Sequence, residues 1–368
     1  MTLPEPNFID RDADSITREW IDLYEQKTGK TLQPAQIERL LIDVGVYREN
    51  LLRIKMQETA KQNLVNYASY PVLDYLGELV GVQRLPAVKS KAVLRFSLSE
   101  PLSVEVRISK GAQVETKDGK IIFSTDEDAV IKVGEEFAEV AASANIEGSI
   151  GNGYLTGEIN NLITPVSYVD NAENIDESSG GADEETDEQL RQRIKEAPEK
   201  YSNAGSKGAY SFHAKSAHPS IIDVSVITKQ AGVVEIYPLT KEGNPGSEVI
   251  GVIQDYLSDE RVRPLTDQVL VSSPERVDFE IIANLILYTF ADAESVQTQV
   301  TEKLEAYKAD LKTKLGKDIV PTQIIALLNS IYGVYRVELT TPFYQELDTS
   351  QWANCTGYTV TIGGYSDG

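Results

Sequence analysis

The chain contains 368 residues, and its 57 acidic side chains against 35 basic ones give a formal net charge of −22 at pH 7. A body this acidic repels phosphate backbones and anionic lipid, which argues against nucleic acid or a membrane surface as a partner. The hydrophobic content of 41% is typical of globular proteins, and at about 150 residues per domain the length predicts two or three domains.

The chain shows no pattern of a secretory signal or a membrane span. Residues 1–6 have neither a basic segment nor an apolar core, so we expect no signal peptide. The strongest apolar run, residues 281–290, has about ten residues, whereas a membrane-spanning helix needs about 20. We therefore expect that the chain does not insert into a membrane and that it is synthesised in a cytoplasm.

Apolar residues at steps of three and four predict two helices near the start of the chain. The first begins around Ile16, with Asp14 or Ser15 as its N-cap. The second opens at Pro34 and runs for roughly thirty residues, which is longer than the usual globular helix. A shorter helical segment follows Pro71. Together they predict an N-terminal helical region over residues 1–88.

The second helix carries an apolar stripe that its short neighbours cannot cover. We therefore expect the stripe to complete its core against other chains, as one member of an intermolecular bundle. The predicted interface residues are Ile37, Leu40, Leu41, Val44, Tyr47, Leu51 and Ile54.

Alternation of apolar and polar residues predicts a β-rich middle domain over residues 89–170. The alternation begins after Lys91, where Leu94 and Phe96 stand two apart. Asp118 and Gly119 are a hairpin signal between two short strands.

An acidic stretch follows, because no Lys or Arg occurs between Val133 and Leu190. Two interpretations are open: a solvated acidic face that runs into a linker, or a site for a cation or a basic partner. No spacing matches the calcium-binding loop. Residues 171–200 are predicted to be an acidic linker followed by a capped helix. The Ser- and Gly-rich composition of residues 170–181 further predicts a hinge there.

The helix after this stretch begins with a predicted capping box. Thr186 caps the first turn while Gln189 reaches back, which satisfies two backbone amides. Acidic residues lie at the positive end of the helix dipole, and Arg191, Arg193 and Lys195 lie further along.

Two small α/β sandwich units are predicted in the remaining sequence, over residues 201–275 and 276–368. Each combines alternating strands with amphipathic helices. No residue-level period links them, so whether they form an internal repeat stays open. The complete prediction is an α+β multidomain fold: an N-terminal helical segment, a β-rich middle domain and C-terminal α/β units.

No catalytic constellation, cofactor motif or metal motif is found. Thr28-Gly29-Lys30-Thr31 ends like a P-loop, but Tyr24 stands where the motif needs glycine. His213 and His218 are five residues apart and do not match the zinc pair of H-E-x-x-H. Cys355 is the single cysteine and has no histidine nearby in the sequence, so we expect it to be inert packing.

Two remaining features leave alternatives open. Carboxylates are abundant enough for an acidic pair of the kind that glycosidases use, although such sites usually add aromatic platforms and only two tryptophans are present. The 18 tyrosines are typical either of interfaces or of half-buried strand positions.

Two passages of this sequence resemble the baseplate J-like family of contractile phage tails and related injection machines. The first is a glycine-punctuated turn over residues 148–159, and the second is Gly180-Gly181 followed by the acidic start of the capped helix. Residues 358–364 are similar to the C-terminal strand of many members. The structural motif residues are Gly148, Gly151, Asn152, Gly157, Gly180, Gly181, Asp183, Thr186, Gln189 and Arg193.

The resemblance implies a structural, non-enzymatic baseplate wedge subunit without a cofactor. It implies that a second copy and a smaller wedge partner join through the N-terminal helices. The C-terminal domains would meet neighbouring wedges and close a ring around the tail tube, near tube- or sheath-associated proteins. The expected location is the tail baseplate of a virion or particle assembled in the bacterial cytoplasm. The alternative is a carbohydrate-active, tail-associated enzyme with an acidic cleft.

Overall fold

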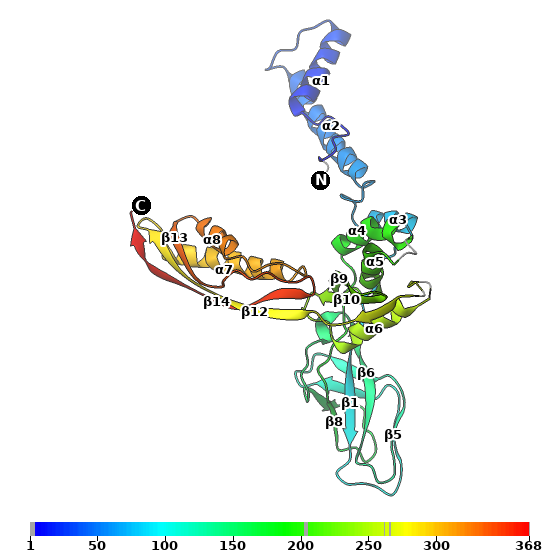
Figure 1. Ribbon diagram of the computed structural model, residues 1–368. Helices are drawn as coiled ribbons and strands as arrows, with labels where there is room; N and C mark the ends of the chain where they lie inside the picture. The colour runs from blue at the N-terminus through cyan, green and yellow to red at the C-terminus, as the bar shows by residue number, and fades with distance from the viewer. Residues whose placement is uncertain (1–3, 202–204, 261, 265, 368) are drawn as a thin grey trace. The chain divides into compact units, whose positions relative to one another are not determined.

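The computed structural model describes residues 4–201, 205–260, 262–264 and 266–367. The chain divides into two compact units. The first combines Met1–Arg84 with Thr186–Lys195, and the second combines Leu85–Glu185 with Glu196–Gly368. The predicted α+β multidomain class is confirmed: helices dominate the first unit, and three sheets with flanking helices make up most of the second (Figure 1).

The first unit contains α1 (Ala13–Thr28), α2 (Ile37–Lys61) and α3 (Val72–Leu79). The N-cap of α1 is Asp12, whose carboxylate accepts a 3.0 Å hydrogen bond from the Ser15 amide. The predicted caps Asp14 and Ser15 were wrong, because both already lie in the first helical turn. The expected length of α2 was also too long: residues 33–36 form a turn closed by the Gln36 amide, so the helix begins three residues after Pro34.

Helices α1 and α2 share a small apolar core. Ile16, Leu32, Ile42 and Val46 are its buried members. Gly45 lets α1 approach α2 closely, because a β-carbon at this position would lie 3.0 Å from the ring of Trp20. Among the described residues, α1 therefore covers one side of α2, and the other side stays exposed.

The second unit begins with an antiparallel six-stranded sheet in the order β7-β3-β4-β6-β1-β8, accompanied by the β2-β5 ribbon. Leu94 and Phe96 of β1 are completely buried, and the hairpin predicted at Gly119 joins β3 to β4. The strands are β1 (Lys89–Ser97), β2 (Val106–Ile108), β3 (Gln113–Thr116), β4 (Ile122–Thr125), β5 (Ala129–Ile131), β6 (Phe137–Glu147), β7 (Ile159–Leu162) and β8 (Asn171–Asn174).

The Asn174 side chain closes this sheet toward a barrel. Its Oδ1 accepts a 2.9 Å hydrogen bond from the Ile159 amide of β7, and its Nδ2 donates to the Leu155 carbonyl at 3.0 Å. The two edge strands are thereby joined by a side chain rather than by a backbone ladder.

The predicted linker at residues 171–181 was wrong. Strand β8 pairs with β1, and beyond it the backbones of Ser179 and Ala182 pair with Lys91 and Val88. Composition alone suggested flexibility, but these main-chain hydrogen bonds fix the segment against β1. The hinge predicted over residues 170–181 stays a prediction, and rotation there would have to break this pairing.

A second, three-stranded sheet has the order β11-β10-β9. Its middle strand is antiparallel to β9 and parallel to β11. Helices α5 and α6 contribute Tyr210, Ala214, Val249, Ile253 and Leu257 to the core of this sheet. The elements are α5 (Lys207–Ala217), β9 (Ile221–Gln230), β10 (Val233–Thr240), α6 (Ser247–Ser258) and β11 (Gln268–Val271).

The third sheet has the order β13-β12-β14, and α7 and α8 lie on one of its faces (Figure 1). Its middle strand is again antiparallel to one neighbour and parallel to the other. The chain visits the elements in a different order from the preceding α/β unit, which explains why no sequence period is evident. The elements are β12 (Glu275–Tyr288), α7 (Ala293–Leu311), α8 (Pro321–Asn329), β13 (Val334–Thr341) and β14 (Gln351–Ser366).

Candidate assembly site

The most unusual surface of the first unit is the face of α2 that α1 does not cover. All seven residues predicted for the interface lie on it, and each is between 37% and 75% exposed. Leu52 and Met56 extend this surface and are exposed as well. Large contiguous apolar surface on a water-soluble protein is typical of an interaction site. We call this surface the α2 face; it consists of Ile37, Leu40, Leu41, Val44, Tyr47, Leu51, Leu52, Ile54 and Met56.

The opposite side of α2 is held by polar contacts within the chain. Gln57 is completely buried; its Nε2 donates to the Pro6 carbonyl at 2.7 Å, and its Oε1 accepts from the Phe8 amide at 2.9 Å. Arg53 donates to Glu49 on the same helix and to the Asp10 carbonyl. These bonds tie the segment before α1 along α2 and leave the α2 face open.

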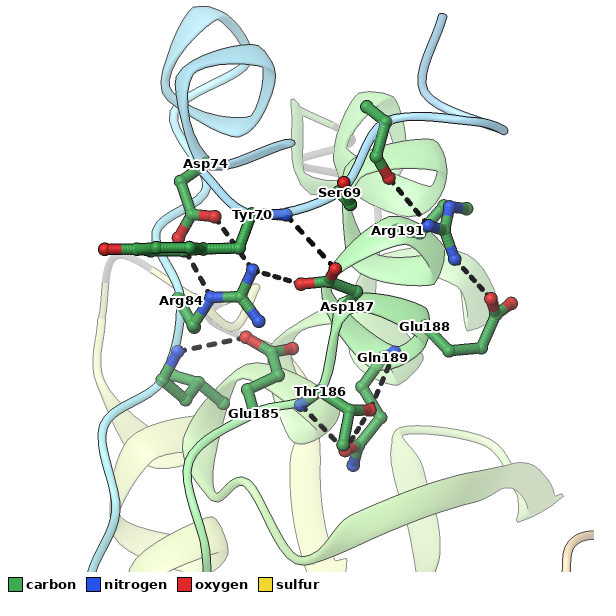
Figure 2. Close-up of polar contacts among 12 residues, drawn as sticks. Ser69, Tyr70, Asp74, Arg84, Glu185, Thr186, Asp187, Glu188, Gln189 and Arg191 are labelled. Carbon is green, nitrogen blue, oxygen red and sulfur yellow. Dashed lines mark hydrogen bonds and ion pairs between the residues drawn. The ribbon is translucent and has the colours of Figure 1, made fainter. Parts of the chain in front are cut away.

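An ion-pair network joins α3 to the start of α4 (Asp187–Glu196) in the same unit (Figure 2). The Arg84 guanidinium donates to both carboxylate oxygens of Asp74, at 2.9 and 2.8 Å, and to Asp187 at 2.6 Å. The second oxygen of Asp187 accepts from the Tyr70 amide at 3.2 Å. The hydrogen bonds from Arg84 lower the pKa of the Asp74 carboxyl. The hydrogen bonds to Asp74 and Asp187 in turn raise the pKa of the Arg84 guanidinium.

The predicted capping residues of α4 lie together (Figure 2). The Thr186 amide donates to Gln189 Oε1 at 3.3 Å, and the Gln189 amide donates to Thr186 Oγ1 at 3.4 Å. Arg193 is buried and donates to the Gln83 carbonyl at 3.2 Å. The Thr186 and Gln189 side chains thus cap the start of α4, while Arg193 reaches the segment that precedes Arg84.

Sequence reasoning missed the hydrogen bonds that Arg191 makes outside its own helix. Its guanidinium donates to the carbonyls of Val65 and Ala68, each at 2.8 Å, in the turn that follows α2. It also pairs with Glu188 one turn earlier (Figure 2). The sequence order suggested only a favourable interaction with the helix dipole, because the carbonyls it contacts lie more than a hundred residues away.

The first passage of the family resemblance meets the beginning of the second passage, residues 180–183, within the second unit. Asn152 uses its Nδ2 to donate to the Gly181 carbonyl and its Oδ1 to accept from the Gly181 amide, both at 2.8 Å. Asp183 accepts from the amide and the hydroxyl of Ser149, at 3.0 and 3.1 Å, which lowers the pKa of its carboxyl. Asn152 Oδ1 also accepts from the Ser90 hydroxyl of β1 at 2.8 Å.

Glycine is required where these passages cross. A β-carbon on Gly181 would lie 2.0 Å from Ser90 Oγ and 2.5 Å from the Gly148 carbonyl oxygen. Gly148 itself has a φ of +113°, which side chains rarely adopt. Gly151 is buried close to Ser90, and the Gly157 amide donates to the Asn174 carbonyl at the barrel closure.

Gly180 connects this crossing to the central α/β elements. Its carbonyl accepts from His218 Nε2 at 3.2 Å, at the end of α5. Glu248, in the first turn of α6, pairs with Lys91 of β1 at 2.5 Å. Residues that look like a linker in the sequence therefore join two parts of the second unit.

Comparison with known proteins identifies the family of this chain. Three family models match consecutive parts of the chain: the baseplate J-like protein barrel domain at residues 93–181, the baseplate J-like central domain at 202–273 and the baseplate J-like protein C-terminal domain at 279–362. The chain belongs to the baseplate J-like family. The barrel match continues to residue 181, in agreement with the pairing of that segment to β1.

Two individual proteins are similar to this baseplate J-like chain. Baseplate protein J of Escherichia phage P2 is 38% identical over 183 residues, which is 49% of this chain and 60% of the length of that relative. The solved structure of the anti-feeding prophage baseplate contains a chain that is 13% identical, with a TM-score of 0.44 over 93% of this chain and 90% of that chain.

The acidic stretch of this family member serves mainly as a set of hydrogen-bond acceptors. Asp176 accepts from the Val93 amide and Asp170 from the Ser99 amide, each at 2.8 Å. Throughout the described ranges no group of three or more His, Cys, Asp or Glu side chains is placed to hold a metal ion. The two open interpretations were a solvated acidic face that runs into a linker and a site for a cation or a basic partner, and these contacts favour neither of them.

The reactive side chains considered in the sequence lie in structural positions. His218 is buried between Ser220 and the Gly180 carbonyl, and burial lowers its pKa. Cys355 is buried in the core of the third sheet, and burial raises the pKa of its thiol. Gly29 ends α1 in the left-handed conformation, so the P-loop-like residues form a helix C-cap.

One surface hollow, of about 470 Å³, lies on the barrel between the β2 segment and residues 164–168. Glu105 is its one acidic lining residue, and Arg107 and Lys110 are its basic ones. Glycosidases need two carboxylates about the scissile bond, which this hollow does not supply. Among the helices in the described part of the chain, none has the length and apolar character to cross a membrane.

Proposed function

We propose that this chain is a structural subunit of the baseplate of a contractile phage tail or a tail-like injection particle, and that it acts by burying surface rather than by chemistry. The observation that carries the proposal is the exposed α2 face. Membership of the baseplate J-like family and the name of the phage P2 relative support it.

The α2 face is proposed to form a wedge bundle with a second copy of this chain and a smaller partner. Moving a Leu or Ile side chain from water into an interface contributes about 1.5–3 kcal/mol. Several such side chains on one helix face supply enough free energy to offset the cost of association. Because the small core between α1 and α2 does not include the residues of the α2 face, burying these residues against a partner would stabilise the complex.

The C-terminal domains are proposed to meet neighbouring wedges and to close a ring around the tail tube, in contact with tube- or sheath-associated proteins. Contacts between unlike surfaces generate a ring when their rotation closes. The proposed location is the tail baseplate of the particle after assembly in the bacterial cytoplasm.

Introducing charge on the α2 face tests the proposal. Leu40→Asp with Leu51→Asp is expected to abolish co-purification with the baseplate proteins encoded alongside this chain, because two carboxylates would be buried without partners. The second unit should keep its unfolding transition, since neither residue belongs to it.

A matched control adds the same charge elsewhere in the first unit. Gln26→Glu with Gln33→Glu changes two exposed polar residues and should leave co-purification intact. Partner capture that survives the Leu40 and Leu51 changes would overturn the placement of the interface on α2. Turnover in a glycan screen that a single carboxylate substitution abolishes would favour the enzyme alternative.

A further inference from the structure

The surface hollow on the barrel combines an apolar floor with a charged rim. Val106 and Ala112 are its most buried lining residues, with 4% and 3% of their surface exposed. Arg107 and Lys110 also line it, and both are exposed. Binding sites typically combine apolar surface with a few polar groups that fix the orientation of the ligand. We call this site the barrel hollow; it lies between residues 105–112 and residues 164–168.

The two basic residues of the barrel hollow have no carboxylate partner within the described ranges. The Asp128 carboxylate accepts a 2.6 Å hydrogen bond from the Lys110 backbone amide, not from its ammonium group. Elsewhere on the same barrel, Arg95 and Lys120 each pair with a carboxylate, at 2.7 and 3.0 Å. The side chains of Arg107 and Lys110 are therefore available to a carboxylate from outside the chain.

Tyr168 lines the barrel hollow in a strained backbone conformation. Its φ is +67°, and no other non-glycine residue in the described part of the chain has a positive φ. A bulky residue rarely adopts this conformation, and such strain persists where the surrounding structure holds it, often at ligand sites.

The loop that carries Tyr168 is fixed at both ends. The Thr164 amide donates to the Gln113 carbonyl at 3.2 Å, and the Asp170 carboxylate accepts from the Ser99 amide at 2.8 Å. Tyr168 is nevertheless 67% exposed. The hollow thus presents an aromatic side chain on a backbone that is already ordered, which lowers the entropy cost of binding.

These features fit a short acidic peptide that also carries an apolar side chain. A guanidinium group binds a carboxylate through two parallel N–H groups, and an ammonium group adds a compact positive charge. The volume of about 470 Å³ falls in the usual range for ligand sites. A saccharide would place hydroxyl groups against the methyl groups of Val106 and Ala112, where they would lose hydrogen bonds to water. The floor therefore favours a peptide over a saccharide.

We propose that the barrel hollow binds an acidic segment of another protein, with a carboxylate on Arg107 and Lys110 and an apolar side chain on Val106. Glu105 is the one acidic lining residue, so the two cations leave the hollow positive. Charges are screened over about 8 Å at physiological ionic strength, so these cations govern the contact despite the net charge of −22. As a contact within a baseplate the binding rests on the proposed function, but it is measurable on the purified chain.

Removal of the two cations tests the proposal. The probe is a pool of fluorescein-labelled hexapeptides in which Asp or Glu alternates with Leu or Val, and a comparison pool has Asn or Gln in place of the acids. Fluorescence anisotropy with the full chain should show that the acidic pool binds at least about tenfold more tightly. Arg107→Gln with Lys110→Gln should abolish this preference, because the carboxylates lose both partners.

A matched control removes the same charge elsewhere on the barrel. Lys89→Gln with Lys117→Gln changes two exposed residues outside the hollow, and the affinity for the acidic pool should change by less than about twofold. Equal losses in the two double variants would overturn the site, because they would show attraction to charge in general.

Substitution of Tyr168 separates binding from stability. Asn tolerates the left-handed conformation, so Tyr168→Asn should keep or raise the midpoint of thermal unfolding. The same variant should bind the acidic pool at least about threefold more weakly, because the ring is lost. Unchanged affinity in this variant would contradict the part assigned to Tyr168.

Two further measurements decide between this site and its alternatives. The chain with Leu40→Asp and Leu51→Asp should bind the acidic pool as the wild type does, so failure of the wedge proposal is distinguishable from failure of this one. Equal affinity of the wild type for the acidic and amide pools would overturn the inference. Binding of oligogalacturonate instead of the acidic pool, lost on the Arg107 and Lys110 changes, would overturn it in favour of an acidic saccharide.

Discussion

The barrel and the helical region bury their apolar residues to very different extents. In the barrel, Leu94, Phe96 and Phe123 are completely buried, and strand alternation directs such residues into one core. In the helical region, α1, α2 and the loop between them contribute four buried apolar residues to one core, while the α2 face is exposed. The barrel forms a large core within its own chain, whereas the helical region has a small core beside a long exposed apolar face.

Truncating one large side chain in each region is the most direct test of this difference in burial. Phe96→Ala should destabilise the second unit by about 3–5 kcal/mol, because it removes a buried ring and leaves a cavity. Leu51→Ala, on the α2 face, should change the stability of the isolated chain by less than about 0.5 kcal/mol. Urea unfolding measures both, and equal losses would show that the α2 face is already covered within the chain.

The first unit depends on polar contacts where the barrel depends on its core. Arg84→Met should cost about 2 kcal/mol, because the largely buried guanidinium, 11% exposed, makes charge-assisted bonds to two carboxylates. Arg95→Met is the control: its pair with Glu139 is exposed on both sides and should contribute about 0–1 kcal/mol.

The Arg84 network also predicts a pH dependence of stability. The pKa of Asp74 is lowered in the folded state, so its contribution is present above the ordinary carboxyl pKa and is lost as the pH falls through the lowered value. Arg84→Met should flatten this acid limb of the unfolding free energy. An acid limb of unchanged slope would show that Asp74 gains nothing from Arg84.

Two glycine substitutions are expected to change the free energy of unfolding in opposite directions. Gly181→Ala should destabilise the second unit by about 1–3 kcal/mol, because its β-carbon would meet Ser90 and the Gly148 carbonyl. Gly251→Ala lies within α6 and has no neighbour within 4 Å, so it should stabilise by about 0.5–1 kcal/mol. Thermal unfolding of the two variants should move the midpoint in opposite directions.

Much of the local structure was predictable from periodicity and capping chemistry. The alternation around Leu94 and Phe96 gave a buried strand, and Gly119 marked the hairpin. Thr186 and Gln189 interact as their spacing indicates. These signals are local: the residues that interact lie within a few positions of one another, so the sequence contains both partners in one short window.

The contacts that organise the site were not predictable in the same way. Ser90 with Asn152, and Arg84 with Asp187, are separated by 62 and 103 residues. The composition of residues 171–181 suggested a linker, but pairing with β1 decided their structure. Composition reports the average preference of a segment, and a ladder of backbone hydrogen bonds to a distant strand overrides it.

The sequence by itself determined the helical stripe of α2, the strand alternation of the barrel and the membership of the baseplate J-like family, because each is written in the order of neighbouring residues. Only the tertiary structure decided that the stripe is left exposed, that the two passages with the family motif meet at Ser90, and that β14 is the outer strand of its sheet. Those outcomes depend on which distant segments cover a surface, and that is set by how the whole chain packs.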